Sequence, residues 1–122
     1  MAHYLEIHSV PKARIQGVKV LSFVDVDFKD EMSPHFETER TFMNDTVRQY
    51  FGADHEDDWD ADYFVLREDD ALYLIKDIEA LYKEPDVDQE EVELIARLIS
   101  VLEFVQSDFG NATHGYVISW SK

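Results

Sequence analysis

The sequence predicts an α+β fold, in which a small, mainly antiparallel sheet of about three strands packs against about three helices in the order β-β-α-α-α-β. Three observations lead to this prediction. One long stretch has apolar residues at helical spacing, three shorter stretches alternate as strands do, and capping residues precede the helical stretches. The chain has 122 residues, the size of one domain, so we treat 1–122 as a single acidic α+β domain.

The stretch 88–109 carries the strongest periodic signal and is expected to be the central helix of the core. Its apolar residues recur at steps of three and four, which places them in one stripe. They are Val92, Ile95, Ala96, Ile99, Leu102 and Val105. Asp88, with Glu91 three residues later, resembles a capping box at the start, and Gly110 is expected to end the helix.

Two strands are expected near the N-terminus. In residues 2–9, apolar and polar residues alternate, and Pro11 is expected to end the strand because proline cannot donate to a sheet ladder. Residues 12–17 then form a basic turn or loop. Residues 18–28 are rich in valine and read as a longer strand, which we expect to pair antiparallel with the first.

The middle of the chain is expected to be helical. Ser33 followed by Pro34 is typical of a helix start, and Gly52 of a helix end, so the first helix is expected over 34–51. Residues 53–62 form an acidic loop, and 63–66 fit either a short strand or a helical turn.

A second helix is expected to follow, capped by Asp69 or Asp70 and continuing to Lys83. A strand over 71–75 is the weaker alternative, because the periodic pattern continues past strand length. Residues 115–121 alternate cleanly and are expected to add a third strand to the sheet.

Charge is the strongest compositional feature, with 27 acidic and 11 basic residues and a net charge of −16. Residues 25–108 hold 26 of the acids but only 7 of the bases, whereas residues 1–24 sum to +2. Such a body repels nucleic acid and anionic membranes and attracts basic surfaces. We therefore expect a basic protein surface as partner, and neither direct nucleic-acid binding nor membrane binding.

The chain has no cysteine, which excludes disulfides, thiol nucleophiles and zinc held by cysteine. Residues 1–17 lack an apolar segment of signal-peptide length, and no stretch approaches the ~18 apolar residues of a membrane span. These features lead us to expect a cytoplasmic protein.

The acidic loop superficially resembles a calcium-binding EF-hand, because acids alternate along it. They are Asp54, Glu56, Asp58, Asp60 and Asp62. An EF-hand begun at Asp54 needs glycine at the sixth position and glutamate at the twelfth, where this chain has Trp59 and Val65. We expect a solvated loop and no metal site, with a metal-dependent enzyme that uses residues 54–62 kept as an alternative.

Catalytic signals are weak elsewhere. The five histidines form no HxH or HExxH pair, no serine lies in a GxSxG motif, and no two glycines form a phosphate-binding loop. Three histidines could converge in space, although their spacing does not indicate it. We therefore predict no enzyme, no catalytic residue and no cofactor.

The predicted partner-binding site combines the acidic loop with the turn before the second helix. Trp59 lies within this tract and has two interpretations: an exposed interface hot spot, or a buried anchor for the loop. The predicted site residues are Asp54, Glu56, Asp57, Asp58, Trp59, Asp60, Asp62, Glu68, Asp69 and Asp70.

These features favour an acidic inhibitor that binds a nuclease or a nucleic-acid-binding complex. Its carboxylates would stand in for phosphates, as in DNA mimics and phage anti-defence proteins. This likeness is one of charge only. An immunity protein that neutralises a cognate toxin fits the same size and charge, and stays open as an alternative.

Overall fold

A computed structural model describes residues 4–22, 27–38, 44–52, 62–83, 88–111 and 113–120. The elements in chain order are β1 (Leu5–Pro11), α1 (Lys12–Ile15), β2 (Val20–Leu21), the 3₁₀ helix η1 (Lys29–Glu31), β3 (Ser33–Thr38), α2 (Asn44–Gly52), β4 (Tyr63–Val65), α3 (Asp70–Glu79), the 3₁₀ helix η2 (Ala80–Lys83), α4 (Gln89–Asp108) and β5 (His114–Trp120).

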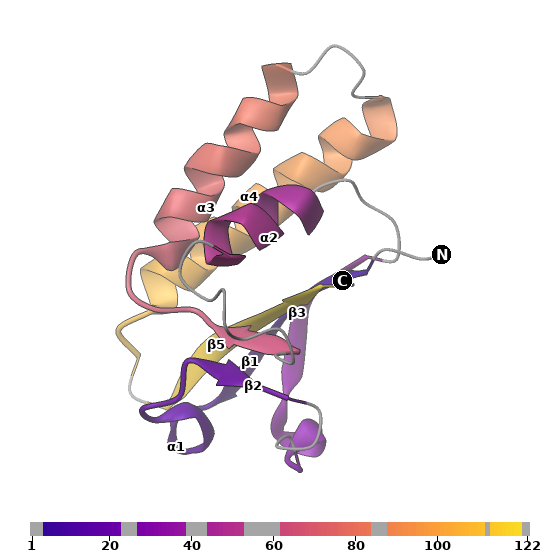
Figure 1. Cartoon of the computed structure of the whole chain (residues 1–122). Helices are drawn as coiled ribbons and strands as arrows, with labels where there is room; N and C mark the ends of the chain where they lie inside the picture. Colours follow the sequence, from indigo (N-terminus) through magenta and orange to yellow (C-terminus); the bar gives the residue numbers. More distant parts are fainter. Residues whose placement is uncertain are drawn as a thin grey trace.

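The described strands form a five-stranded sheet in the order β2-β4-β5-β1-β3, and every neighbouring pair is antiparallel. Figure 1 shows α2, α3 and α4 together on one side of this sheet, with α1 near its opposite side. The predicted α+β class is confirmed. The predicted three strands and three helices are wrong, since the described residues contain five strands and four α-helices.

The prediction of a long helix near residues 88–109 is confirmed by α4, which runs from Gln89 to Asp108. Asp88 is its N-cap, and its carboxylate accepts a hydrogen bond of 2.9 Å from the backbone N–H of Glu91. This bond satisfies one of the amide groups that the first helical turn leaves unpaired. The capping signal in the sequence therefore marked the true start of the helix.

Strand β5 is the middle strand of the sheet, and its residues from Tyr116 to Trp120 are all buried. Tyr116, Ile118 and Trp120 face the helices, where they join the larger apolar cluster. Val117 points to the other face and joins a smaller cluster with Ile15 of α1. The sheet is thus covered on both sides, which explains why this strand carries apolar residues at successive positions.

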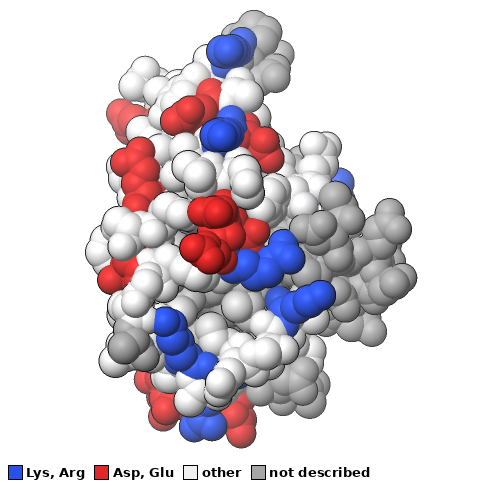
Figure 2. Space-filling model, turned by 90° about the vertical axis from the view of Figure 1, so that its left-hand side faces the viewer, with Lys and Arg blue, Asp and Glu red and all other residues white. Residues whose placement is uncertain are grey.

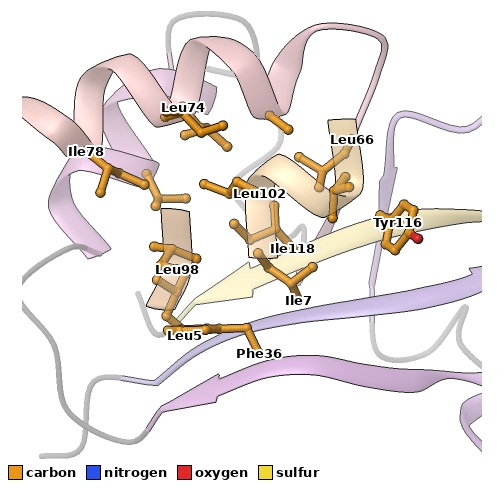
Figure 3. Close-up of a cluster of buried hydrophobic side chains, with 14 of the residues drawn as sticks. Leu5, Ile7, Phe36, Leu66, Leu74, Ile78, Leu98, Leu102, Tyr116 and Ile118 are labelled. Atoms are coloured by element: carbon orange, nitrogen blue, oxygen red, sulfur yellow. The ribbon is translucent and has the colours of Figure 1, made fainter. Parts of the chain in front are cut away.

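The larger cluster is the main core, and Figure 3 shows its side chains between the sheet and the helices. Leu98 and Leu102 of α4 and Leu74 of α3 are fully buried there. They meet Leu5 and Ile7, the two β1 residues that the alternating pattern placed on one face. The inward stripe of α4 and the inward face of β1 therefore follow directly from apolar periodicity.

The helix expected over 34–51 is wrong in its first part, because residues 33–38 form strand β3, while residues 44–51 belong to α2 (Asn44–Gly52) and residues 39–43 lie outside the described part of the chain. Ser-Pro is also compatible with an edge strand, where the missing N–H of proline faces away from the ladder. Strand β3 is the last strand in the order, paired only with β1 among the described strands. On this strand, Arg97 of α4 donates to the carbonyl of Glu37 at 3.3 Å.

Of the strand expected over 18–28, the described residues contain only β2, Val20–Leu21. Residues 23–26 lie outside the described part of the chain. Its predicted pairing with the first strand is wrong, since β2 pairs with β4, and β1 pairs with β3 and β5. Phe28 lies outside β2, just before η1, and is buried in the smaller cluster, so its place in the apolar pattern reflects a core contact outside the strand.

The first turn of the chain is helical, because residues 12–15 form α1 where a loop was expected. Gly17 follows with φ of +73°, a conformation that side chains other than glycine rarely adopt. Strand β1 includes Pro11 as its last residue, paired with His114. No helix in the described part of the chain is long and apolar enough to cross a membrane.

Candidate partner-binding surface

Most of the predicted site lies outside the described residues. Residues 53–61 include Asp54, Glu56, Asp57, Asp58, Trp59 and Asp60, so the predictions for these six residues stay predictions. The structure describes the remaining four, which are Asp62, Glu68, Asp69 and Asp70.

Strand β4 separates the described site residues into two places. Asp62 comes just before the strand, where its backbone N–H donates to the carbonyl of Leu21 at 2.9 Å. Residues 68–70 come after the strand, in the turn that leads into α3. The turn and Asp62 therefore lie at opposite ends of β4, and the structure does not bring them together.

Asp70 is buried, with only 3% of its surface exposed. Its carboxylate accepts hydrogen bonds from the backbone N–H of Arg67 at 2.6 Å, from the Arg67 Nε at 3.3 Å and from the Tyr50 hydroxyl at 2.5 Å. A buried carboxylate is tolerated when it is paired in this way. Asp70 thus connects the turn, α2 and α3, and its carboxylate does not face a partner.

Asp69 is the N-cap residue of α3, but its side chain makes no capping hydrogen bond. It adopts φ of +70°, in the left-handed region that aspartate tolerates better than most residues. Its carboxylate instead accepts a hydrogen bond of 3.1 Å from the Gln106 side chain of α4. Asp69 is half-buried and Glu68 is exposed, so these two carboxylates remain at the surface.

The side of α3 that faces away from the core carries exposed apolar groups as well as charges. Tyr73 is 50% exposed and Leu72 is 40% exposed. The Lys76 ammonium lies 5.8 Å from the centre of the Tyr73 ring. Asp69 and Asp77 are each four positions from Tyr73, one on either side, and so share its side of the helix. We call these five residues the outer face of α3.

Carboxylates extend from this face over residues 68–108, which contain α3, η2 and α4 and which we call the α3–α4 hairpin. Residues 68–108 contain 13 acidic and 3 basic residues, a net charge of −10. The exposed acids among the described residues of this span are Glu68, Asp77, Glu79, Asp88, Glu90, Glu93 and Glu103. Figure 2 shows acidic side chains over much of one face, interrupted by basic ones, so they do not form one unbroken patch there.

A second cluster joins the end of α4 to the start of β5, and the sequence reasoning missed it. The Asp108 carboxylate accepts a hydrogen bond from the Tyr116 hydroxyl at 2.5 Å and lies 2.8 Å from the His114 Nε2. These contacts, the Tyr116 hydrogen bond foremost, hold the pKa of Asp108 below its ordinary value of 3.8. Burial, and then the hydrogen bond to Asp108, raises the pKa of Tyr116 well above 10.

Asn111 shows what this cluster does for the fold. Its side-chain nitrogen donates to the carbonyls of Asp108 at 2.8 Å and His114 at 2.9 Å, and its side-chain oxygen accepts from the backbone N–H groups of Thr113 and His114. The turn between α4 and β5 is therefore closed by side-chain hydrogen bonds. The asparagine after Gly110 was the signal in the sequence that could have indicated it.

His35 lies beside this cluster because of an irregularity in β3. The register shifts between Ile7, which pairs with Phe36, and His8, which pairs with Pro34, so His35 is the extra residue of a bulge. Its ring stacks on Phe104 of α4 and meets the edge of Tyr116. Burial, followed by the nearby His114 and His8, lowers the pKa of His35 below 6.5. Strand pairing thus brings together histidines whose spacing gave no sign of it.

Comparisons of the chain with family models, with curated proteins and with solved structures find no match. Among the described residues, no group of three or more histidine or acidic side chains is arranged to hold a metal ion.

Proposed function

We propose that the protein is an acidic binding module that attaches to a basic, nucleic-acid-binding protein and blocks it. The observation that carries the proposal is the outer face of α3, where Leu72 and Tyr73 are exposed among carboxylates. Exposed tyrosine surrounded by charge is typical of an interface hot spot, in which the aromatic ring supplies affinity and the charges supply orientation.

Electrostatics support a basic partner. A hairpin with a net charge of −10 produces a negative potential that attracts cationic surfaces and speeds their association. Surfaces that bind nucleic acid are rich in lysine and arginine, because they must neutralise phosphates. Carboxylates that occupy those positions would exclude nucleic acid, which makes inhibition the natural consequence of binding.

Buried Asp70 refines the proposed surface. Because its carboxylate is held by Arg67 and Tyr50, it orients the turn and α3 without touching the partner. The described part of the proposed surface is therefore Glu68 together with the outer face of α3.

The test begins with capture of partners from the native host by the tagged protein, followed by kinetic measurement on each purified partner. We expect the association rate to fall steeply between low and high salt, because steering between exposed charges is screened. We also expect nucleic acid to compete with the protein for the partner. Binding that is independent of salt, or that leaves nucleic-acid binding untouched, contradicts the proposal.

Variants locate the surface. Tyr73→Ala is expected to weaken binding by about tenfold or more, because a hot-spot aromatic is removed. Tyr82→Ala is the matched control, since Tyr82 is a similarly exposed tyrosine (42%) outside the outer face of α3. Asp77→Asn is expected mainly to slow association. Equal losses for the two tyrosine variants contradict a site centred on α3.

A further inference from the structure

A cavity of about 580 Å³ lies between α1, the β4–α3 turn and the end of α4. Its volume falls within the range of about 300–1,000 Å³ that small-molecule sites occupy. The cavity shares only Glu68 with the described part of the proposed partner-binding surface. The lining residues are Lys12, Ala13, Ile15, Gln16, Val65, Leu66, Arg67, Glu68, Phe109 and Gly115.

The floor of the cavity is apolar and rigidly placed. Ile15, Val65 and Leu66 are buried. Gly115 lies in β5, and a Cβ atom added there would come within 2.7 Å of the Ile15 Cδ1, so Ile15 packs directly against the glycine. Pairing of β5 with β1 and β4 fixes this floor, which makes it a preformed surface for an apolar molecule.

Two basic residues, Lys12 and Arg67, belong to the lining. The Lys12 ammonium donates to the backbone carbonyl of Asn111 and has no carboxylate partner among the described residues. An ammonium has three N–H donors, so this contact leaves donor capacity for an anion. The Arg67 guanidinium is half-exposed and pairs through Nε with Asp70, while Glu68 is the one acid in the lining.

This arrangement differs from the rest of the molecule. The chain has more than twice as many acids as bases, yet the cavity lining holds two basic residues and one acid. Charge and apolar surface at this cavity therefore complement a small molecule that is itself apolar with one negative group.

We propose that this cavity binds an amphipathic anion, a small molecule with an apolar body and a single carboxylate. The apolar body lies on Ile15, Val65 and Phe109, and the carboxylate accepts hydrogen bonds from Lys12. The cavity contains no residue of the outer face of α3 and shares only Glu68 with the proposed partner-binding surface, so binding of a small molecule here can be tested without the partner.

The test uses the ¹⁵N-labelled full chain titrated with phenylbutyrate and, separately, with phenylbutanol, which has the same apolar body without the charge. We expect the shifted amides to cluster at residues 12–16, 65–68, 109 and 115. The alcohol is expected to bind about tenfold more weakly, because a hydrogen bond to a charged group is lost. Shifts elsewhere, no shifts, or equal binding of the two compounds overturn the proposal.

Variants separate the two parts of the site. Ala13→Phe places a large ring in the cavity from an exposed position and is expected to abolish phenylbutyrate binding, whereas Ala96→Phe, also at an exposed alanine, leaves it unchanged. Lys12→Gln is expected to weaken phenylbutyrate to the level of the alcohol, with Lys19→Gln as the matched control.

Glu68→Gln tests whether the negative charge of Glu68 repels the carboxylate of the ligand. Removal of the one acid in the lining is expected to tighten phenylbutyrate binding and to leave phenylbutanol binding unchanged. Thermal denaturation of each variant verifies that it is folded. Unchanged binding in Ala13→Phe, or in both charge variants, overturns the assignment even if the wild type binds phenylbutyrate.

Discussion

Asp70 shows how strongly burial decides the role of a carboxylate. Its three hydrogen bonds come from Arg67 and Tyr50, and only 3% of the Asp70 surface is exposed. Asp70→Ala removes the acceptor of these three hydrogen bonds and leaves a small cavity, and it is expected to lower the free energy of unfolding by about 3 kcal/mol. Urea denaturation of the purified variant measures this loss.

Asp77→Ala is the control for Asp70, because Asp77 is exposed on the same helix. Its effect is expected to stay within about 0.5 kcal/mol, as for most surface substitutions. Equal effects of the two substitutions would show that the carboxylate of Asp70 contributes nothing to stability.

Gly17 is the residue whose backbone requires glycine. At φ of +73°, alanine is expected to destabilise the protein by about 1 kcal/mol, since a Cβ is strained there. Gly110→Ala is the matched control, because Gly110 has no positive φ and no atom within 4 Å of an added Cβ. Chemical denaturation of both variants should separate them, and equal stabilities would contradict the argument.

The α4–β5 turn makes stability depend on pH. The Tyr116 hydrogen bond, with help from His114, lowers the pKa of Asp108 in the folded state below 3.8, so the ionised carboxylate favours folding. This contribution is fully present above the ordinary pKa of 3.8 and is lost as the pH falls through the lower, folded-state pKa.

Asp108→Asn tests this dependence. We expect the variant to be less stable than the wild type near neutral pH, and the difference to shrink in acid. Denaturation midpoints across the pH range measure it. The control is Glu103→Gln, which changes an exposed acid on the same helix. If the stability difference between the wild type and Asp108→Asn does not change with pH, the charge of the carboxylate does not cause it.

Single elements could be predicted where local pattern and burial agree. The apolar stripe and cap of α4 placed its start correctly, and the alternation in β1 and β5 predicted two strands. The sequence signal was weaker for strands that form only because they pair with segments far away in the chain. Strand β4 is three residues long, and its strand character comes from pairing with β2 and β5, about which its own sequence says nothing.

Strand β3 shows how one local signal fits two structures. Ser33 and Pro34 satisfy the rules for a helix start and also those for a strand at the edge of a sheet. Of its six residues only Phe36 is buried, so the sequence lacks the alternation of apolar and polar residues that would indicate a strand. Knowledge that β3 lies last in the sheet was needed, and that is a property of topology.

Charge acts on the molecule as a whole. Carboxylates on the α3–α4 hairpin repel one another, so we expect the thermal midpoint to rise as sodium chloride screens them. Glu79→Lys is expected to raise the midpoint at low salt, because it relieves repulsion near the C-terminal end of α3, where a cation is also favoured.

The gain from Glu79→Lys should diminish as salt increases, and potassium chloride should act like sodium chloride if screening is the cause. Ser100→Ala, an exposed neutral substitution on α4, is the control. A midpoint insensitive to salt in all three proteins would mean that self-repulsion is too weak to matter.

Of the predicted site residues that the structure describes, Glu68 and Asp69 lie at the surface, as the acidic pattern suggested. The basic partner that the net charge indicates stays a prediction. Burial of Asp70, exposure of Tyr73 and the meeting of His35 with Tyr116 depend on how helices dock on the sheet. The sequence pattern describes each element alone, so such contacts between elements could not be read from it.

Strand β3 also bears on how copies of the protein meet in concentrated solution. An exposed strand commonly recruits a strand from another molecule through its free backbone groups. Here Pro34 offers no N–H, and Arg97 already occupies the carbonyl of Glu37. An incoming chain would find interrupted hydrogen bonding at both places, which discourages the fusion of sheets into larger aggregates.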